Sequence, residues 1–192
     1  MKLHNLKLYL MFPLSIPSIL IYLSMKDKEC INADMESIGY EPGVWGLHRV
    51  LVDSFSFRSV FRMRVRDESE IKYAFLFFSY RPLSSLELNC MQKVGKGLAI
   101  WHGYSSVIFC NSIGDHCSIY QNVTIGRGRY MGNGTQIPDI GNNVAIYAGA
   151  IVVGGITIGD YCEIGAGTVV TKDVPPHSTV IGNPMRILPG KL

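Results

Sequence analysis

A six-residue period of aliphatic side chains runs through the second half of this 192-residue chain. An α-helix repeats every 3.6 residues and a β-strand every two, so neither gives this spacing. A solenoid does, because each flat face takes six residues and turns one aliphatic side chain toward the axis. We expect roughly four three-sided turns. The aliphatic positions are Val94, Ile100, Val107, Ile113, Ile119, Ile125, Ile140, Ile146, Val152, Ile158, Ile164 and Val170.

The distribution of glycine marks a boundary in the chain. Of 20 glycines, 17 follow residue 91, and Gly, Asn and Asp suit the tight corners of a solenoid. We therefore expect a mainly β repeat domain at residues 86–192, preceded by an α-helical region at residues 1–85. Apolar spacing predicts one helical segment from Val44 to Phe57 and another over 71–78, with an acidic start at 67–70.

The repeat register breaks once, between Ile125 and Ile140. Residues 126–139 must therefore leave the solenoid as a loop. Loops on a rigid scaffold often carry binding and catalytic residues, so this segment is a first candidate for a functional site.

Composition excludes several classes of protein. A chain that is 47% hydrophobic and 17% charged is not intrinsically disordered, and glycine without a Gly-X-Y period excludes collagen. A net charge of +3, with Arg58–Arg66 as its one basic cluster, is far below the excess typical of nucleic-acid binding. Five cysteines without a CxxC pair indicate a reducing compartment, hence a cytoplasmic protein.

The apolar stretch at residues 8–24 resembles the front of a signal peptide, but no small-residue cleavage site follows it. Its 17 residues, interrupted by Pro13 and Pro17, are short for a membrane-spanning helix. We expect a helix packed within the protein. Peripheral contact with the inner face of the membrane is the alternative.

Four strings in the repeat region carry a family resemblance. The strings are GLAIWHG (97–103), SIYQNVTIG (118–126), IGAGTVV (164–170) and KDVPPHS (172–178). They resemble the left-handed β-helix acyltransferases, and within these the serine acetyltransferases and their relatives that O-acetylate capsular and exopolysaccharides. The resemblance is close over residues 86–190 and weak from about residue 31. It implies a left-handed parallel β-helix, acetyl-CoA as co-substrate, no metal and a homotrimer with sites between subunits.

Two residues are the catalytic candidates that the resemblance implies. His102 occupies the position of the family's catalytic histidine, and an imidazole can take the proton from an attacking hydroxyl. Glu87, fifteen residues earlier, stands where serine acetyltransferases have an aspartate. At about one turn's distance it would orient the imidazole. The alternative role of His102 is that of a structural histidine, and the alternative for Glu87 is an exposed acid at the entrance to the first turn.

The acceptor-binding candidates depart from the serine acetyltransferase pattern. Trp101 replaces an aspartate before the histidine, and Gln136-Ile137 replaces an arginine-histidine pair. One pair of charged groups that would bind the ammonium and the carboxylate of serine is therefore missing. Asp34 aligns weakly with an acceptor-binding aspartate of the family. Trp101 suits stacking on a sugar, with Tyr104 and Tyr130 as additions; its alternative role is packing.

For the donor, the family threads the pantetheine arm between neighbouring subunits past small residues. The matching positions are Gly126, Ala148 and Ala166. Lys172 and Arg186 are candidates for the nucleotide phosphates by charge alone, with a solvated surface role as their alternative.

The resulting prediction is an acetyl-CoA-dependent O-acetyltransferase acting on a hydroxyl of a surface polysaccharide or its precursor. The alternative within this class is a serine O-acetyltransferase. A metal-dependent β-helix enzyme needs about three histidine ligands, and the solenoid offers only His102 and His116 before the terminal His177. A non-catalytic binding platform is the third class; it predicts no binding of acetyl-CoA.

Overall fold

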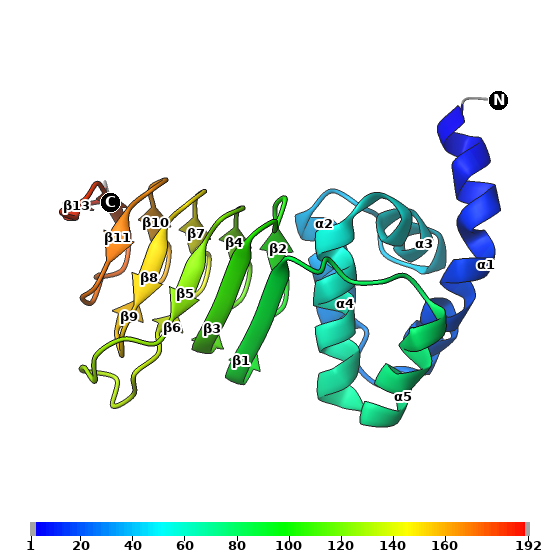
Figure 1. The fold of residues 1–192 in the computed structure, drawn as a ribbon, viewed down its shortest axis with the longest axis horizontal. Coiled ribbons are helices and arrows are strands. Elements are labelled where there is room, and N and C mark those ends of the chain that lie inside the picture. Colours follow the sequence, from blue (N-terminus) through cyan, green and yellow to red (C-terminus); the bar gives the residue numbers. More distant parts are fainter. Residues whose placement is uncertain (1–2, 191–192) are drawn as a thin grey trace. The chain divides into compact units, whose positions relative to one another are not determined.

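The computed structural model describes residues 3–190, and the chain forms two compact units, Met1–Ser84 and Ser85–Leu192. The first unit consists of helices and the second of strands (Figure 1). The helices are α1 (Leu3–Ser24), α2 (Glu29–Ser37), α3 (Val44–Asp53), α4 (Phe55–Glu68), α5 (Glu70–Phe75) and the 3-10 helix η1 (Leu76–Phe78). The strands are β1 (Leu86–Val94), β2 (Ala99–Ile100), β3 (Ser106–Ile113), β4 (Ser118–Ile119), β5 (Thr124–Gly126), β6 (Asp139–Ile140), β7 (Ala145–Ile146), β8 (Ile151–Val153), β9 (Thr157–Ile158), β10 (Glu163–Ile164), β11 (Val169–Val170), β12 (Ser178–Ile181) and β13 (Arg186–Pro189).

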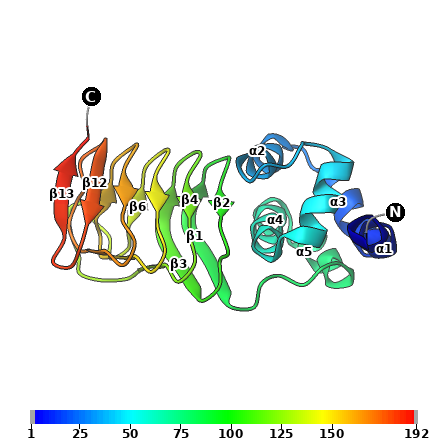
Figure 2. The ribbon, with the colours of Figure 1, turned by 90° about the horizontal axis from the view of Figure 1, so that it is seen from above.

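The second unit is a three-sided parallel β-solenoid whose turns lie one behind another (Figure 2). Face 1 consists of the parallel strands β2, β4, β7, β10 and β12, closed by the antiparallel strand β13. Face 2 contains β5, β8 and β11 beside the first halves of β1 and β3, and face 3 contains β6 and β9 beside their second halves. The predicted solenoid is confirmed, with about five turns on face 1 rather than four.

The interior is formed by the predicted aliphatic side chains, with one exception. Ile119, Ile146 and Ile164 stack directly above one another on face 1, fully buried. Val107 is 40% exposed, and Ile108 is buried instead. The prediction for Val107 is wrong because the chain between β2 and β3 is longer than a six-residue period allows.

Glycine at the corner between faces 3 and 1 is required by close approach of successive turns. A Cβ on Gly114 would lie 2.6 Å from the carbonyl carbon of Gly141. Side chains then link the turns, because Asn142 Oδ1 accepts from the Asp115 N–H at 2.9 Å and Asp160 Oδ1 accepts from the Asn142 N–H at 2.7 Å. This ladder holds one corner of the solenoid straight.

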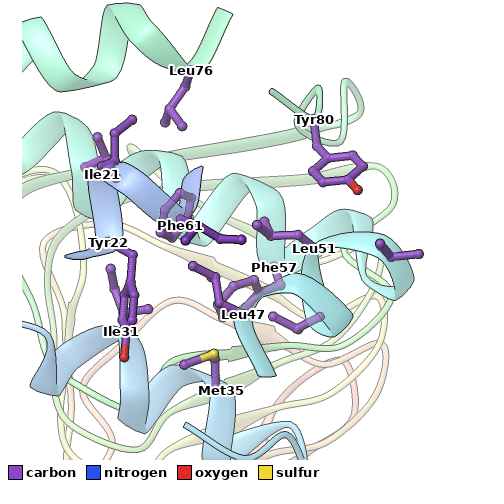
Figure 3. Packing of buried hydrophobic residues seen from close by; sticks show 14 of the residues in the cluster. Ile21, Tyr22, Ile31, Met35, Leu47, Leu51, Phe57, Phe61, Leu76 and Tyr80 are labelled. Atoms are coloured by element: carbon purple, nitrogen blue, oxygen red, sulfur yellow. The ribbon is translucent and has the colours of Figure 1, made fainter. Parts of the chain in front are cut away.

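The helical unit has its own apolar core, contributed by α1 to α4 and η1 (Figure 3). The predicted helix from Val44 to Phe57 is in fact two helices, α3 and α4, because Ser54 is extended and its hydroxyl accepts from the Phe57 N–H at 3.1 Å. Asp67 and Glu68 end α4 rather than begin the next helix, and Ser69 caps α5.

Helix α1 is one continuous helix that contains both Pro13 and Pro17. The expected interruption is wrong, although each proline removes one backbone hydrogen bond. By length and composition Asn5–Ser24 is a candidate membrane span, with a third of the window (33%) buried inside the protein. Contact with lipid stays a prediction.

A buried histidine joins α1 to α3. His48 Nε2 donates to the Leu8 carbonyl at 3.0 Å, and its Nδ1 lies 2.6 Å from the Ser15 hydroxyl. Burial lowers the pKa of His48 from its ordinary value of 6.5, although the Leu8 hydrogen bond and the charge of Asp53 oppose this effect. The folded protein therefore holds the imidazole neutral.

This histidine predicts a loss of stability in mild acid. The unfolded chain binds a proton as the pH falls through 6.5, whereas folded His48 resists protonation, so acidification favours unfolding. We expect the urea midpoint of the helical unit to fall between pH 7.5 and 5.5. His48→Gln should reduce that pH dependence, and an equal fall in the variant would contradict the assignment.

Candidate active site

The residues between β2 and β3 form a lengthened corner, called here the His102 corner (residues 101–105). Ile100 pairs with Ile119 and Val107 pairs with Thr124. The chain therefore advances seven residues from Ile100 to Val107 but only five residues over the same distance in the next turn, from Ile119 to Thr124. Two additional residues cannot follow the neighbouring turn, so the corner extends outward from the solenoid.

This corner exposes the predicted catalytic histidine. His102, Tyr104 and Ser105 are all exposed, and His102 and Ser105 have positive φ angles of 57° and 53°. Several other corner residues share such angles, including His116 and Asn122. The corner's length, rather than its backbone angle, distinguishes His102 from the other histidines of the solenoid.

Glu87 lies in the layer next to this corner. It stands on β1 as the register partner of Val107, and both side chains are exposed. Within residues 3–190, no hydrogen bond or ion pair joins the Glu87 carboxylate to the His102 imidazole. What supports the predicted pairing of Glu87 with His102 is therefore that the two residues lie in neighbouring turns, and the pairing stays a prediction.

Trp101 belongs to a row of stacked aromatic side chains that the sequence reasoning missed. Its ring stacks on Tyr120 with centroids 6.3 Å apart and planes at 26°, and Tyr120 meets Tyr147 at 5.2 Å and 35°. We call these three residues the aromatic row. Each directly follows the aliphatic residue of a face 1 strand, so aligning the repeats by that residue would have found them.

Gln121 adds an unpaired acceptor beside the aromatic row. It follows Tyr120 in the turn next to the His102 corner, and its Oε1 is buried without a hydrogen-bond partner among the described residues. Such an atom costs ~1–3 kcal/mol when it stays unpaired, so a ligand that donates a hydrogen bond there would gain affinity.

Asp34 is not available to an acceptor. It is 1% exposed in the helical unit, where its Oδ2 and Oδ1 accept from Arg64 Nε at 2.9 Å and Nη2 at 3.0 Å. Burial acts to lower the pKa of Arg64, but the hydrogen bonds and charge of Asp34 outweigh it and raise that pKa. The predicted binding role is corrected to a buried ion pair.

The loop at residues 126–139 leaves the solenoid between β5 and β6, as expected, and is drawn in yellow-green in Figure 1. It is held to the body by Asn133, whose side-chain nitrogen donates to Asp139 Oδ2 at 2.7 Å. Gln136 is half-buried and its carbonyl accepts from the Gly128 N–H. This loop leaves the corner between faces 2 and 3, so within one subunit Gln136 and His102 lie at different corners.

The donor candidates fall into three places. Ala148 and Ala166 follow face 1 in successive turns, at the same edge as His102, and the Gly167 N–H donates to the Ala148 carbonyl at 2.9 Å. Gly126 lies at the start of the loop, with open space where a Cβ would be. Lys172 and Arg186 are exposed in the last turns, and their phosphate-binding roles stay predictions.

Residues 3–190 contain no group of three or more His, Cys, Asp or Glu side chains that could hold a metal ion. The side chains at the His102 corner are an exposed imidazole, the Glu87 carboxylate in the next layer and the aromatic row.

Comparisons with known proteins agree with the fold. Residues 138–172 match the family Bacterial transferase hexapeptide (six repeats). A serine acetyltransferase of Synechococcus elongatus is 44% identical over 109 residues, covering 56% of this chain and 44% of that protein. One from Staphylococcus aureus is 46% identical over 110 residues, covering 56% and 51%. The chain thus spans about half the length of these relatives.

Solved structures extend the likeness to the helical unit. The apoenzyme of soybean serine acetyltransferase matches with a TM-score of 0.69 and 26% identity, covering 96% of this chain and 83% of that one. The same enzyme complexed with serine matches with a TM-score of 0.68 and 25% identity, covering the same shares. Repeat, fold and sequence together show that residues 85–190 form a hexapeptide-repeat left-handed β-helix homologous to that of serine acetyltransferases.

Proposed function

We propose that this protein transfers an acetyl group from acetyl-CoA to the hydroxyl of an acceptor. The observation that carries the proposal is His102, presented on a lengthened corner of a solenoid homologous to that of acetyltransferases. A solvent-facing imidazole at a fixed place on a rigid scaffold is suited to general base catalysis.

The reaction needs one base and no covalent enzyme intermediate. His102 takes the proton of the acceptor hydroxyl while the hydroxyl oxygen attacks the carbonyl carbon of the acetyl-CoA thioester. The tetrahedral intermediate collapses, the carbon–sulfur bond breaks, and the imidazolium returns the proton to the departing CoA sulfur. Glu87 would stabilise that cation from the adjoining layer, and backbone N–H groups would stabilise the oxyanion.

The small side chains beside this corner suit the arm of acetyl-CoA. Ala148, Gly149, Ala166 and Gly167 follow one another along the edge that carries His102. An arm lying along this strip would bring its thioester toward the imidazole. Gln121 and Asn122 belong to the turn between His102 and this strip, and the Gly149 N–H donates to the Gln121 carbonyl.

We also propose a homotrimer. His102 and Gln136 occupy different corners of one subunit. A site that uses both the corner and the loop forms only where two subunits meet, which agrees with the family resemblance.

L-Serine is the acceptor that the comparisons support, since the relatives are serine acetyltransferases and a similar soybean structure is complexed with serine. They do not support the polysaccharide that we predicted first. A sugar hydroxyl remains a second candidate because of one observation in this chain, Trp101 stacked beside the base.

Release of free CoA thiol tests both candidates. We expect acetyl-CoA turnover to depend on an added acceptor, with L-serine, methyl glucoside and N-acetylglucosamine compared at equal concentrations. Thiol release without any dependence on acceptor, or no release at all, would contradict the proposed transfer.

A further inference from the structure

Helix α1 buries two serines and exposes a run of large apolar side chains. Ser15 and Ser18 are fully buried, and their hydroxyls lie 2.6 Å from His48 Nδ1 and 2.6 Å from the Ser79 hydroxyl. From residue 8 to residue 25 the chain has no charged, Asn or Gln side chain. A surface helix of a water-soluble unit has polar side chains on its outer side, so this helix is reversed. Its exposed apolar side chains are Leu10, Phe12, Leu14, Ile16, Leu20 and Leu23.

Exposed aromatic side chains from other helices adjoin this side of α1. On α3, the Trp45 ring centroid lies 6.5 Å from that of Tyr9 and 6.4 Å from that of Phe12. Phe75 of α5 and Phe78 of η1 line an apolar groove of about 490 Å³ against the second half of α1. We call the exposed apolar side chains of α1, with Trp45, Phe75 and Phe78, the outer apolar face. A contiguous exposed surface of this kind typically marks contact with a partner or a membrane.

Basic side chains accompany the outer apolar face. Arg49 lies beside Tyr9 and Trp45 around a hollow of about 370 Å³. Trp, Tyr and basic side chains gather where proteins meet the headgroups of a membrane, and the basic ones favour anionic lipid. Lys72 is partly neutralised, because Glu68 accepts from its Nζ at 2.6 Å. The other charged residues of the segments 5–28 and 70–81 are Lys7, Lys26, Lys28 and Arg81 against Asp27 and Glu70.

This combination identifies the occupant that the face fits. An anionic membrane supplies apolar chains and negative headgroups together. A protein partner would need an apolar surface bordered by acids, and the segments named above supply few acids for a second copy of this chain. The charges therefore favour lipid.

The inner side of α1 excludes a spanning arrangement. His48 Nε2 donates to the Leu8 carbonyl, and the Tyr80 hydroxyl donates to the Met11 carbonyl at 2.8 Å. These bonds and the buried serines hold one side of the helix against α3 and the end of η1. Only the outer side can therefore meet lipid, as in helices that lie in the membrane plane, ~5–10 Å deep.

We propose that the outer apolar face binds the surface of an anionic lipid membrane, with α1 in the membrane plane and acyl chains entering the groove beside Phe75 and Phe78. At residues 8–24 the sequence left lipid contact open as an alternative. The structure adds the reversed helix, the aromatic side chains of three further elements and the basic residues among them. The inference does not depend on the proposed acetyl transfer.

Sedimentation with vesicles tests the proposal on the full-length protein. We expect binding to vesicles of phosphatidylcholine with phosphatidylglycerol, weaker binding to phosphatidylcholine alone, and a loss of the difference between ~0.1 M and ~1 M salt. Leu20→Glu combined with Leu23→Glu should weaken binding to the anionic vesicles more than about tenfold, because apolar burial is replaced by carboxylates among lipid chains.

Leu188→Glu is the matched control. Leu188 is also exposed, but it lies on β13 of the solenoid, so this variant should bind vesicles like the original chain. Circular dichroism and the unfolding midpoint check that the variants fold. Vesicle binding that the double variant retains in full, or no binding of the original chain to anionic vesicles, overturns the proposal.

Tryptophan fluorescence gives an independent measurement on the face itself. The chain has two tryptophans, and Trp101→Phe leaves Trp45 as the single one. We expect anionic vesicles to shift the Trp45 emission to shorter wavelength and lipids with brominated acyl chains to quench it. Emission that neither shifts nor is quenched overturns the placement of this face in lipid.

The remaining outcomes identify other occupants or separate the two proposals. Protein that resists an alkaline carbonate wash of the membrane overturns the in-plane arrangement. A double variant with a smaller assembly by light scattering, in a chain that ignores vesicles, makes the face a contact between copies and also overturns the proposal. Vesicle binding without acetyl transfer to any acceptor contradicts the proposed function alone, and transfer without vesicle binding contradicts this inference alone.

Discussion

Replacing His102 with alanine is expected to lower kcat for acetyl transfer by about 10²–10⁴, the usual contribution of a general base. The side chain is exposed on a lengthened corner and makes no contact that holds the solenoid together among the described residues. The variant should therefore fold like the original chain. Acceptor-dependent release of CoA thiol measures the rate, and circular dichroism with the unfolding midpoint checks the fold.

His116→Ala is the matched control for this experiment. His116 is also exposed, also has a positive φ, and lies at another corner of the same solenoid. Its loss should leave kcat within about twofold, as is usual for surface substitutions. If His102→Ala transferred acetyl groups at the original rate, or if both variants fell equally, His102 would not be the base.

Replacing Asp34 with alanine is expected to destabilise the helical unit by about 3–5 kcal/mol, because it removes the carboxylate that is ion-paired with the buried Arg64 guanidinium. Asp34 and Arg64 are 1% and 8% exposed, and two hydrogen bonds join them. Urea unfolding followed by far-ultraviolet circular dichroism measures the loss, since the helices dominate that signal.

Two comparisons distinguish this structural role from the acceptor-binding role that the resemblance implies. Glu36→Ala changes an exposed acid of the same helix and should alter stability by no more than about 0.5 kcal/mol. Asp34→Leu combined with Arg64→Met should recover most of the lost stability, since replacing both partners of a buried pair is often neutral. An Asp34→Ala protein of normal stability but raised acceptor KM would restore the binding role.

The helical unit was the harder half to predict. Its helix content followed from apolar spacing, but Ser54 divides one predicted helix in two, and α1 continues through two prolines. In both places tertiary packing and a single capping hydroxyl outweigh local preference. Asp34 was misassigned for a related reason. Nothing in its neighbours along the chain indicates that Arg64, thirty residues later, encloses its carboxylate.

At the solenoid the sequence alone determined the repeat fold and the loop at 126–139, and the family resemblance implied His102 as the candidate base. Because an inward-facing side chain recurs at a fixed interval along the chain, the buried positions can be predicted from the sequence. Contacts between turns cannot be predicted in this way. The residue offset between paired turns is 20 at Glu87 and Val107, 19 at Ile100 and Ile119, and 17 at Val107 and Thr124. Only the tertiary structure shows these changes of register, and they decide that Val107 faces outward, that His102 stands on an extended corner, and that Trp101 stacks on Tyr120.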